Sequence, residues 1–441
     1  MRIVTKAAYA APAVGLAGLG LPLLIYLPEY YGTVVGLPLG LVGMAFLMAR
    51  LADIIVDPLA GALIDRTRSR HGRFRFWLAL GTPLLMLSVY GLFMPPLGPP
   101  QAASLTRLVL CLAGTYAAWS LCFVAHVGWG STLSNDYDER NAIFAWCQAL
   151  FLVGGLAITA IPLLPALRAT PEQALPAMGW FILLSLPVGV ALALLLVREH
   201  PAGLRRPPDW NDYRRLLGQA GIARLLAADF LSSTAVYAAG GVFFFYYGFI
   251  HGLAPAETAA LLFAVKLGAI AGAYLWGRLG TLLEKHRALA LGFGGLALMT
   301  LVVHLLPWSG RTAGMVILGG FGVLLSADPV LVRSMMADLG DERRLATGAD
   351  QMGTMVALLS VSDKLSAAIG PALALAALGW AGFDPQAAQQ TSLALNTLTA
   401  AAIWVPLVLQ AAAVPLVWRH PLTASRHQAI RTELAVLEGG D

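Results

Sequence analysis

Residues 36–63 read GLPLGLVGMAFLMARLADIIVDPLAGAL, an apolar stretch that carries two aspartates, Asp53 and Asp57. About 20 apolar residues are enough to cross a bilayer as a helix, so this stretch predicts a membrane-spanning helix. One acidic side chain at the middle of such a helix costs about 2.5–3.5 kcal/mol on insertion. A spacing of four residues places both carboxylates on one helical face, where together they can surround a small cation.

The composition also indicates a membrane protein. Of 441 residues, 58% are hydrophobic and 12% are charged. A soluble chain of this length cannot bury so much apolar surface, whereas a bilayer requires it. The three cysteines all lie in apolar segments and are interpreted as small buried residues, not as a disulfide set or a metal site. The sequence contains no phosphate-binding loop, HExxH motif or nucleophile elbow. We therefore expect that the protein is not an enzyme and binds no cofactor.

Twelve apolar segments of at least about 18 residues predict an all-α membrane protein. They cover residues 8–29, 36–64, 74–95, 104–133, 142–168 and 175–198 in the first half of the chain, and 222–250, 256–283, 287–306, 312–337, 349–380 and 390–419 in the second. The polar segment between the two groups is the one obvious linker. We therefore expect a six-helix bundle over residues 1–197, a linker over 198–221, a second six-helix bundle over 222–420 and a tail over 421–441.

The distribution of charge predicts an orientation. The net charge is +5, and the basic residues gather in alternate connections, chiefly in the loop 65–75 and the linker 198–224. By the positive-inside rule these connections and both termini are cytoplasmic. This pattern argues against a nucleic-acid partner and for a multi-pass protein of the bacterial inner membrane.

Three segments carry a resemblance to a known family. Residues 53–61 (DIIVDPLAG), followed by 65–73 (DRTRSRHGR), closely resemble the helix 2 signature of the glycoside–pentoside–hexuronide:cation symporters, which belong to the major facilitator superfamily. Residues 135–140 (NDYDER) resemble that family's helix 4–5 loop, and 338–348 with Lys364 resemble its helix 10–11 region. The matches run from the second to the eleventh predicted span, so the resemblance implies the major facilitator fold for the whole chain.

The resemblance implies that Asp53 and Asp57 bind the coupling Na⁺, Li⁺ or H⁺, with Lys364 as their cationic neighbour. Ser120 falls where a helix 4 hydroxyl assists the cation. Carboxylates suit a hard cation, but two neighbouring carboxylates can also share a proton, so the coupling ion stays open between Na⁺ and H⁺. The alternative interpretation is an interhelical ion pair of the aspartates with Arg50, Lys364 or both.

The chain departs from the family pattern at the solute site. Galactoside carriers of the family recognise sugar hydroxyls with acids on helices 1 and 4 and an arginine on helix 5, but the matching positions here are 17–18, Phe123 and Gln148. We therefore expect another sugar or a less polar solute. Phe123, His126, Trp146 and Gln148 are the candidate solute contacts, although His126 and Trp146 also fit structural packing roles.

The basic run after residue 64 resembles the family's cytoplasmic gate, where arginines pair with acids at the ends of neighbouring helices. The alternative is a run that only anchors the topology. The candidate gate residues are Asp65, Arg66, Arg70, Arg73, Asp138, Arg140, Asp338 and Asp341. Asp229, Lys266 and Asp328 also lie within or near predicted spans; Lys266 and Asp328 belong to no matched motif and fit either pathway residues or structural pairs.

These features predict a cation-coupled symporter that moves a sugar or glycoside-like solute by alternating access. One alternative is a carrier of lysolipids or other amphipathic solutes that uses the same cation site. Another is a membrane sensor or assembly factor that does not transport. The expected partners are the solute, a monovalent cation and the lipid bilayer, and we expect a monomer.

Overall fold

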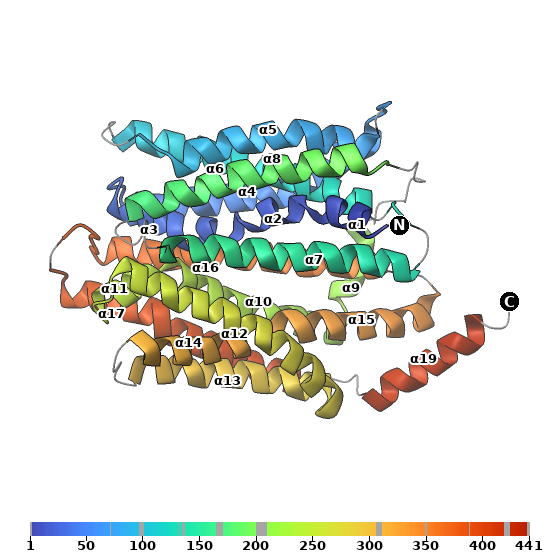
Figure 1. Ribbon diagram of the computed structural model, residues 1–441. Helices are drawn as coiled ribbons and strands as arrows, with labels where there is room; N and C mark the ends of the chain where they lie inside the picture. Colours follow the sequence, from blue (N-terminus) through green and yellow to red (C-terminus); the bar gives the residue numbers. More distant parts are fainter. Residues whose placement is uncertain are drawn as a thin grey trace. The chain divides into compact units, whose positions relative to one another are not determined.

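The protein is helical throughout the part that the computed structural model describes (Figure 1). The described residues are 2–70, 72–96, 101–130, 132–134, 137–164, 171–199, 210–305, 311–348, 351–387, 389–418 and 424–438. Across these ranges no β-strand occurs. They contain twelve helices or helix runs that are long and apolar enough to cross a membrane, which confirms the predicted fold class.

The helices follow one another with short connections. The first part of the chain contains α1 (Ile3–Ala10), α2 (Pro12–Ala17), a π-helix (Pro22–Tyr26), α3 (Leu27–Thr33), α4 (Leu39–Arg66), α5 (Arg73–Phe93), α6 (Gln101–Gly130), α7 (Tyr137–Ala160), a 3-10 turn (Ile161–Leu163) and α8 (Pro171–Leu196). The rest contains α9 (Trp210–Leu217), α10 (Ala220–Gly241), α11 (Phe243–Phe249), α12 (Pro255–Leu282), α13 (Lys285–Leu305), α14 (Arg311–Leu325), α15 (Ala327–Thr347), α16 (Met352–Trp380), α17 (Ser392–Thr399), a π-helix (Ala400–Trp404), α18 (Val405–Trp418) and α19 (Ala424–Glu438).

Two spans differ from the apolar segments that predict them. The first span is a run of short helices because Pro12, Pro22 and Pro28 each lack the N–H that a continuous helix needs. The tenth span was expected to end at residue 337, but α15 continues to Thr347, where Gly348 ends it in the left-handed conformation at φ 70°. Hydropathy marks where a helix leaves the apolar layer, whereas the backbone hydrogen bonds of α15 continue through the charged residues that follow.

Contacts along the chain group it into two units, each described by itself. Unit 1 comprises residues 1–205, 240–260 and 371–398, and unit 2 comprises 206–239, 261–370 and 399–441. The division into a bundle at 1–197, a linker at 198–221, a bundle at 222–420 and a tail at 421–441 stays a prediction. Within the predicted linker and tail, the structure forms α9 and α19.

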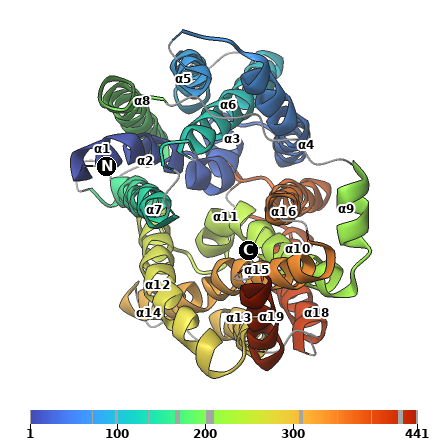
Figure 2. The ribbon, with the colours of Figure 1, turned by 90° about the vertical axis from the view of Figure 1, so that its right-hand side faces the viewer.

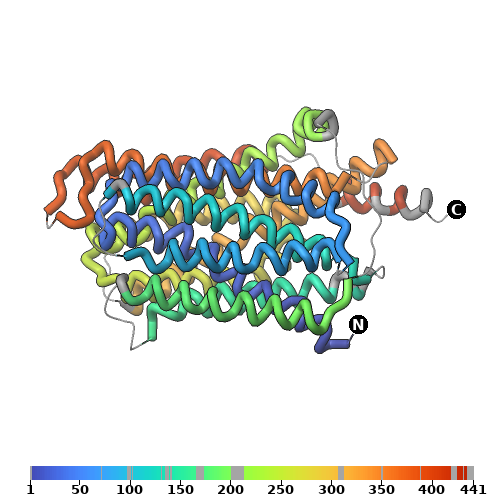
Figure 3. Tube along the Cα trace, turned by 90° about the horizontal axis from the view of Figure 1, so that it is seen from above, coloured from blue at the N-terminus to red at the C-terminus, as the bar shows by residue number. Residues whose placement is uncertain are grey.

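In unit 1, α5 packs along both α6 and α8, and α4 packs along α6 (Figures 1 and 3). Glycines allow the closest approaches between its helices. A Cβ on Gly15 would lie 2.6 Å from Leu186 Cβ, and a Cβ on Gly154 would lie 2.3 Å from the Val14 carbonyl oxygen. Small residues at such crossings are typical of membrane helices, whose backbones come together without an apolar driving force.

One end of unit 1 is closed by segments from distant parts of the chain. Gln386 Nε2 donates a hydrogen bond to the Thr33 carbonyl oxygen at 2.9 Å. A Cβ on Gly379 of α16 would lie 3.0 Å from the Gly40 backbone nitrogen of α4. The start of α4 and the end of α16 therefore meet backbone to backbone in this unit.

Unit 2 has its own apolar core, built by residues of α10, α12, α13, α15, α16 and α18 (Figure 2). Phe293 of α13 and Met336 of α15 are completely buried in it. The tail helix α19 packs on α15, and Ile430 is buried among the α19 side chains that the structure describes. This core positions the polar side chains of α10, α15 and α16 that are described below.

Candidate functional site

The candidate cation site lies on α4 in unit 1. Asp53 is completely buried, and Ser120 Oγ of the neighbouring α6 donates a hydrogen bond to Asp53 Oδ1 at 2.6 Å. Asp57 is partly buried one turn further along α4. The packing of α4 on α6 thus brings together two of the three oxygen-bearing side chains that the sequence assigns to the cation.

Arg50 compensates part of the negative charge at this site. Its Nη1 atom lies 3.9 Å from Asp53 Oδ2, and its guanidinium stacks over the Tyr116 ring at 4.5 Å from the ring centre. The 3.9 Å separation is an ion pair and is too long for a hydrogen bond. Arg50 thus offsets part of the charge of Asp53, and the oxygen atoms of the two carboxylates suit a monovalent cation.

Lys364, the expected charge partner, lies on α16 and belongs to unit 2. Only 7% of its surface is exposed. A buried ammonium group in a membrane span requires a counter-charge or polar contacts. Its place beside Asp53 and Asp57 stays a prediction from the family resemblance.

The side chains of Asp53, Asp57 and Ser120 offer only oxygen atoms, which suit Na⁺ or a proton better than a soft metal. In the described ranges no group of three or more His, Cys, Asp or Glu side chains is placed to hold a metal ion. Two carboxylates and one hydroxyl therefore fit a weakly held, exchangeable ion better than a permanently bound divalent metal.

Three of the four candidate solute contacts are exposed on unit 1. They are Phe123 of α6 and Trp146 and Gln148 of α7. The Phe123 ring stacks on Trp119, with ring centres 5.0 Å apart, and Trp119 Nε1 donates to the Leu16 carbonyl oxygen at 3.3 Å. Trp119 was missed from the sequence, although its spacing of four from Phe123 is the signal that could have found it.

His126 has the surroundings of a structural histidine. It is buried, its Nε2 atom lies 2.8 Å from the Tyr9 carbonyl oxygen, and its ring stacks on the Tyr9 ring. The Tyr9 hydroxyl in turn donates to the His126 carbonyl oxygen. These contacts join α1 to α6 and favour the structural interpretation of His126 over solute contact.

Part of the predicted gate forms an ion pair within unit 1. Arg73 Nη1 lies 3.1 Å from Asp65 Oδ1. The Glu199 carboxylate caps α5, because it accepts hydrogen bonds from the backbone N–H groups of residues 73–75 at 3.0–3.1 Å. These N–H groups have no partner inside the helix, and a negative charge is favourable at this end. Glu199 lies over 120 residues away in sequence, so no local pattern identified it.

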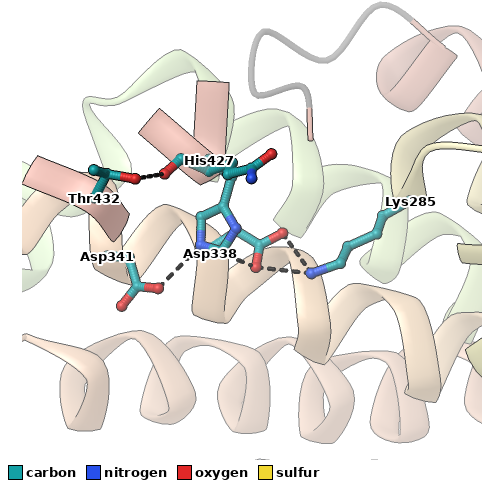
Figure 4. Close-up of polar contacts among 6 residues, drawn as sticks. Lys285, Asp338, Asp341, His427 and Thr432 are labelled. Carbon is teal, nitrogen blue, oxygen red and sulfur yellow. Dashed lines mark hydrogen bonds and ion pairs between the residues drawn. The ribbon is translucent and has the colours of Figure 1, made fainter. Parts of the chain in front are cut away.

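Asp338 and Asp341, the gate candidates of α15, contact residues that the sequence did not single out (Figure 4). Lys285 Nζ of α13 donates to both oxygens of Asp338, at 2.8 and 2.7 Å. His427 Nε2 of α19 lies 3.0 Å from Asp341 Oδ2 and 3.5 Å from Asp338 Oδ1. These four residues form a clasp, and we use this name for them below.

The other gate candidates have no described pairing. Arg66 and Arg70 are exposed at the end of α4 and in the turn after it. Asp138 and Arg140 lie in α7, and their side chains fall outside the described part of the structure. The gate role of these residues stays a prediction.

The sequence matches the family described as MFS/sugar transport protein over residues 8–424. The chain belongs to this family. It is 28% identical over 407 residues to "Inner membrane symporter YicJ" of Escherichia coli (strain K12), covering 87% of this chain and 84% of that protein. It is 25% identical over 424 residues to "Putative glycoside/cation symporter YagG" of the same strain, covering 92% and 89%.

The fold agrees with this membership of the MFS/sugar transport protein family. A crystal structure of the nucleoside transporter NupG matches with a TM-score of 0.69 at 10% identity and covers 94% of this chain and 99% of that chain. The family match over residues 8–424 confirms the predicted membership of the major facilitator superfamily. The protein is a membrane transport protein.

The Ser120 hydroxyl gives a test of the cation site. Ser120→Ala removes one oxygen from the site and the hydrogen bond to Asp53, and we expect cation affinity to fall about tenfold, or by about 1.4 kcal/mol. Cation binding to purified protein, followed by calorimetry, measures this change. Thr115→Val is the matched control, because Thr115 is buried on the same helix and its hydroxyl has no hydrogen-bond partner in the described ranges. Equal affinities of the two variants would remove Ser120 from the site.

The clasp gives a test of how the tail helix is held. His427→Ala removes the contacts of α19 with Asp338 and Asp341, and since a partly exposed polar contact of this kind contributes about 0.2–1 kcal/mol, amide exchange in α19 should be up to about fivefold faster. Hydrogen–deuterium exchange with mass spectrometry measures this effect. Gln428→Ala, at an exposed position of the same helix, is the control. Unchanged exchange in His427→Ala would show that the clasp does not hold the helix.

Proposed function

We propose that this protein is a cation-coupled symporter that moves a sugar or glycoside-like solute across the inner membrane by alternating access. The observation that carries the proposal is the buried Asp53 carboxylate, held by Ser120 and followed one turn later by Asp57. Membership of the MFS/sugar transport protein family and the printed names of YicJ and YagG support it. The coupling ion is Na⁺ or H⁺.

In this proposal the cation loads first. A monovalent cation binds at the Asp53 and Asp57 carboxylates and neutralises part of their charge. Neutralisation lowers the cost of holding α4 in the apolar layer and stabilises the arrangement that binds the solute. The coupling is reciprocal, so bound solute tightens the cation by the same factor as bound cation tightens the solute.

We infer the class of solute from the side chains that this chain has where galactoside carriers of the family have charged groups. Phe123 and Gln148 replace those groups, and the stacked Trp119 and Phe123 present flat apolar faces. Aromatic faces pack well against the less polar faces of sugar rings. A sugar or glycoside recognised by stacking and few charged contacts fits this set best.

The closed end of unit 1 fits the outward gate of such a transporter. There the start of α4 meets the end of α16 at Gly40 and Gly379, and Gln386 donates to Thr33. The basic loop 65–75 follows the opposite end of α4. With the positive-inside rule, we propose that the closed end faces the periplasm and that both termini are cytoplasmic.

Loss of the second aspartate tests the cation role. Asp57→Asn keeps the shape of the side chain and removes its charge, so we expect cation-driven accumulation of solute in vesicles to fall at least about tenfold, equivalent to about 1.4 kcal/mol. Solute exchange without a cation gradient should persist, because the neutral asparagine imitates the carboxylate whose charge a bound cation has neutralised. Glu433→Gln, an exposed carboxylate on α19, is the control. Full accumulation by Asp57→Asn would show that the cation binds elsewhere, and uptake of lysolipid but no sugar would favour the amphipathic alternative.

Closure at Gly40 and Gly379 gives a second test. Gly379→Leu would place a side chain against the Gly40 backbone, and overpacking of this kind costs about 1–3 kcal/mol. If this end must close in each cycle, transport should fall about tenfold or more, since tenfold corresponds to about 1.4 kcal/mol. Labelling of a cysteine introduced at position 35 from the periplasmic side should rise at the same time. Gly277→Leu is the control, because a Cβ there meets no atom within 4 Å; normal transport by Gly379→Leu would contradict the gate assignment.

A further inference from the structure

Unit 2 contains a second group of acidic side chains that the proposed function does not use. Asp229 of α10, Asp328 of α15 and Asp363 of α16 lie within electrostatic range of one another. Ser362 Oγ donates to Asp229 Oδ2 at 2.5 Å, and the Tyr237 hydroxyl donates to Asp363 Oδ1 at 2.7 Å. Two of the three carboxylates are thus held by hydroxyl groups.

Asp328 differs from the other two. Only 7% of its surface is exposed, and its Oδ1 atom has no hydrogen-bond partner in the described part of the chain. The completely buried Ser232 hydroxyl faces the Asp328 carboxyl group, and it too lacks a partner of normal geometry there. Gln410 is 2% exposed, donates to the Ser232 carbonyl oxygen at 3.3 Å, and leaves its own Oε1 atom without a partner among the described residues. Such a succession of unsatisfied buried oxygens is rare in native proteins and requires an explanation.

The charges around Asp328 do not balance. Arg333 of α15 is the cation within electrostatic range, against the three carboxylates of Asp229, Asp328 and Asp363. Where the side chains are described, none of these carboxylates has an ion pair within 4 Å. A buried carboxylate without an ion pair or sufficient hydrogen bonds is costly and is normally neutralised. Asp229 and Asp363 have charge-stabilising hydroxyl donors, and Asp363 is exposed, so the need for neutralisation falls on Asp328.

Asp328 lies within its membrane span, far from the loops at either end. It lies in the first turn of α15, directly after the break between α14 and α15 at Ser326. At this break the Val323 carbonyl oxygen accepts hydrogen bonds from Ser326 Oγ and Trp276 Nε1, each at 2.8 Å. The continuous membrane span runs from Thr312 to Thr347, so Asp328 is near its middle.

We propose that Asp328 is a proton-binding site in unit 2, with Ser232 and Gln410 beside it as polar partners. One proton converts the carboxylate to a carboxylic acid, which offers one O–H donor and retains acceptor capacity for the Ser232 hydroxyl. The described side chains include no three-ligand metal group, so a proton suits this group better than a metal ion. The site goes beyond the proposed function, because it stands whether or not the cation at Asp53 and Asp57 is Na⁺.

Infrared spectroscopy of the full-length protein in lipid, with the spectrum of each variant subtracted from that of the wild type, tests the proposal directly. The wild type should show the C=O stretching band of a buried protonated carboxyl group, with a shift between H₂O and D₂O. Asp328→Asn should abolish this band, and Glu433→Gln should keep it. Asp57→Asn should also keep it, which separates this test from that of the proposed function. A band that persists unchanged in Asp328→Asn would overturn the proposal.

A milder variant covers the case in which Asp328→Asn does not fold. Ser232→Ala leaves the carboxyl group in place and removes one neighbour, so the band should shift in frequency without disappearing. An unshifted band in folded Ser232→Ala protein would overturn the assignment. Equilibrium binding of radioactive Na⁺ distinguishes the ligand: wild type and Asp328→Asn should bind equal amounts, and a loss of bound Na⁺ in the variant would identify a sodium site instead.

Discussion

The cost of placing a carboxylate in the apolar layer of a membrane is the constraint on which the rest of this structure depends. Asp53 is completely buried on α4 and is compensated by the Ser120 hydroxyl and by Arg50. The hydroxyl lies on a second helix, so α4 and α6 must pack closely and in register for the charge to be tolerated. The same contact that stabilises the helix pair therefore builds the candidate cation site.

The twelve spans and the family were predictable from sequence because both depend on local patterns. Apolar segments of about 20 residues have few folds available other than spanning helices, and residues 53–61 and 65–73 carry the helix 2 signature in one continuous piece. The end of α15 was predicted wrongly at residue 337 for a related reason. Hydropathy reports the boundary of the lipid layer, whereas the helix ends where Gly348 adopts positive φ.

Contacts between residues far apart in sequence could not be predicted. Glu199 caps α5, and His427 contacts Asp338 and Asp341, yet neither residue belongs to a motif. The Ser120 contact was anticipated only because a family resemblance supplied the pairing, and the structure gives its length of 2.6 Å. Charge pattern indicates which side chains need a partner, while tertiary packing decides which partner they receive.

Asp53 and Asp328 are both buried aspartates with a serine hydroxyl beside them, but they are compensated differently. Asp53 receives the hydrogen bond of Ser120 and lies 3.9 Å from the Arg50 guanidinium, so its charge is partly compensated before a cation arrives. Asp328 faces Ser232 without such a bond, and Arg333 is the described cation within electrostatic range of its carboxylate, together with the acids Asp229 and Asp363. The first arrangement favours an ion that binds and leaves with the transport cycle. The second favours a proton that stays until the surroundings of Asp328 change, because its departure would leave an uncompensated charge at the middle of the span.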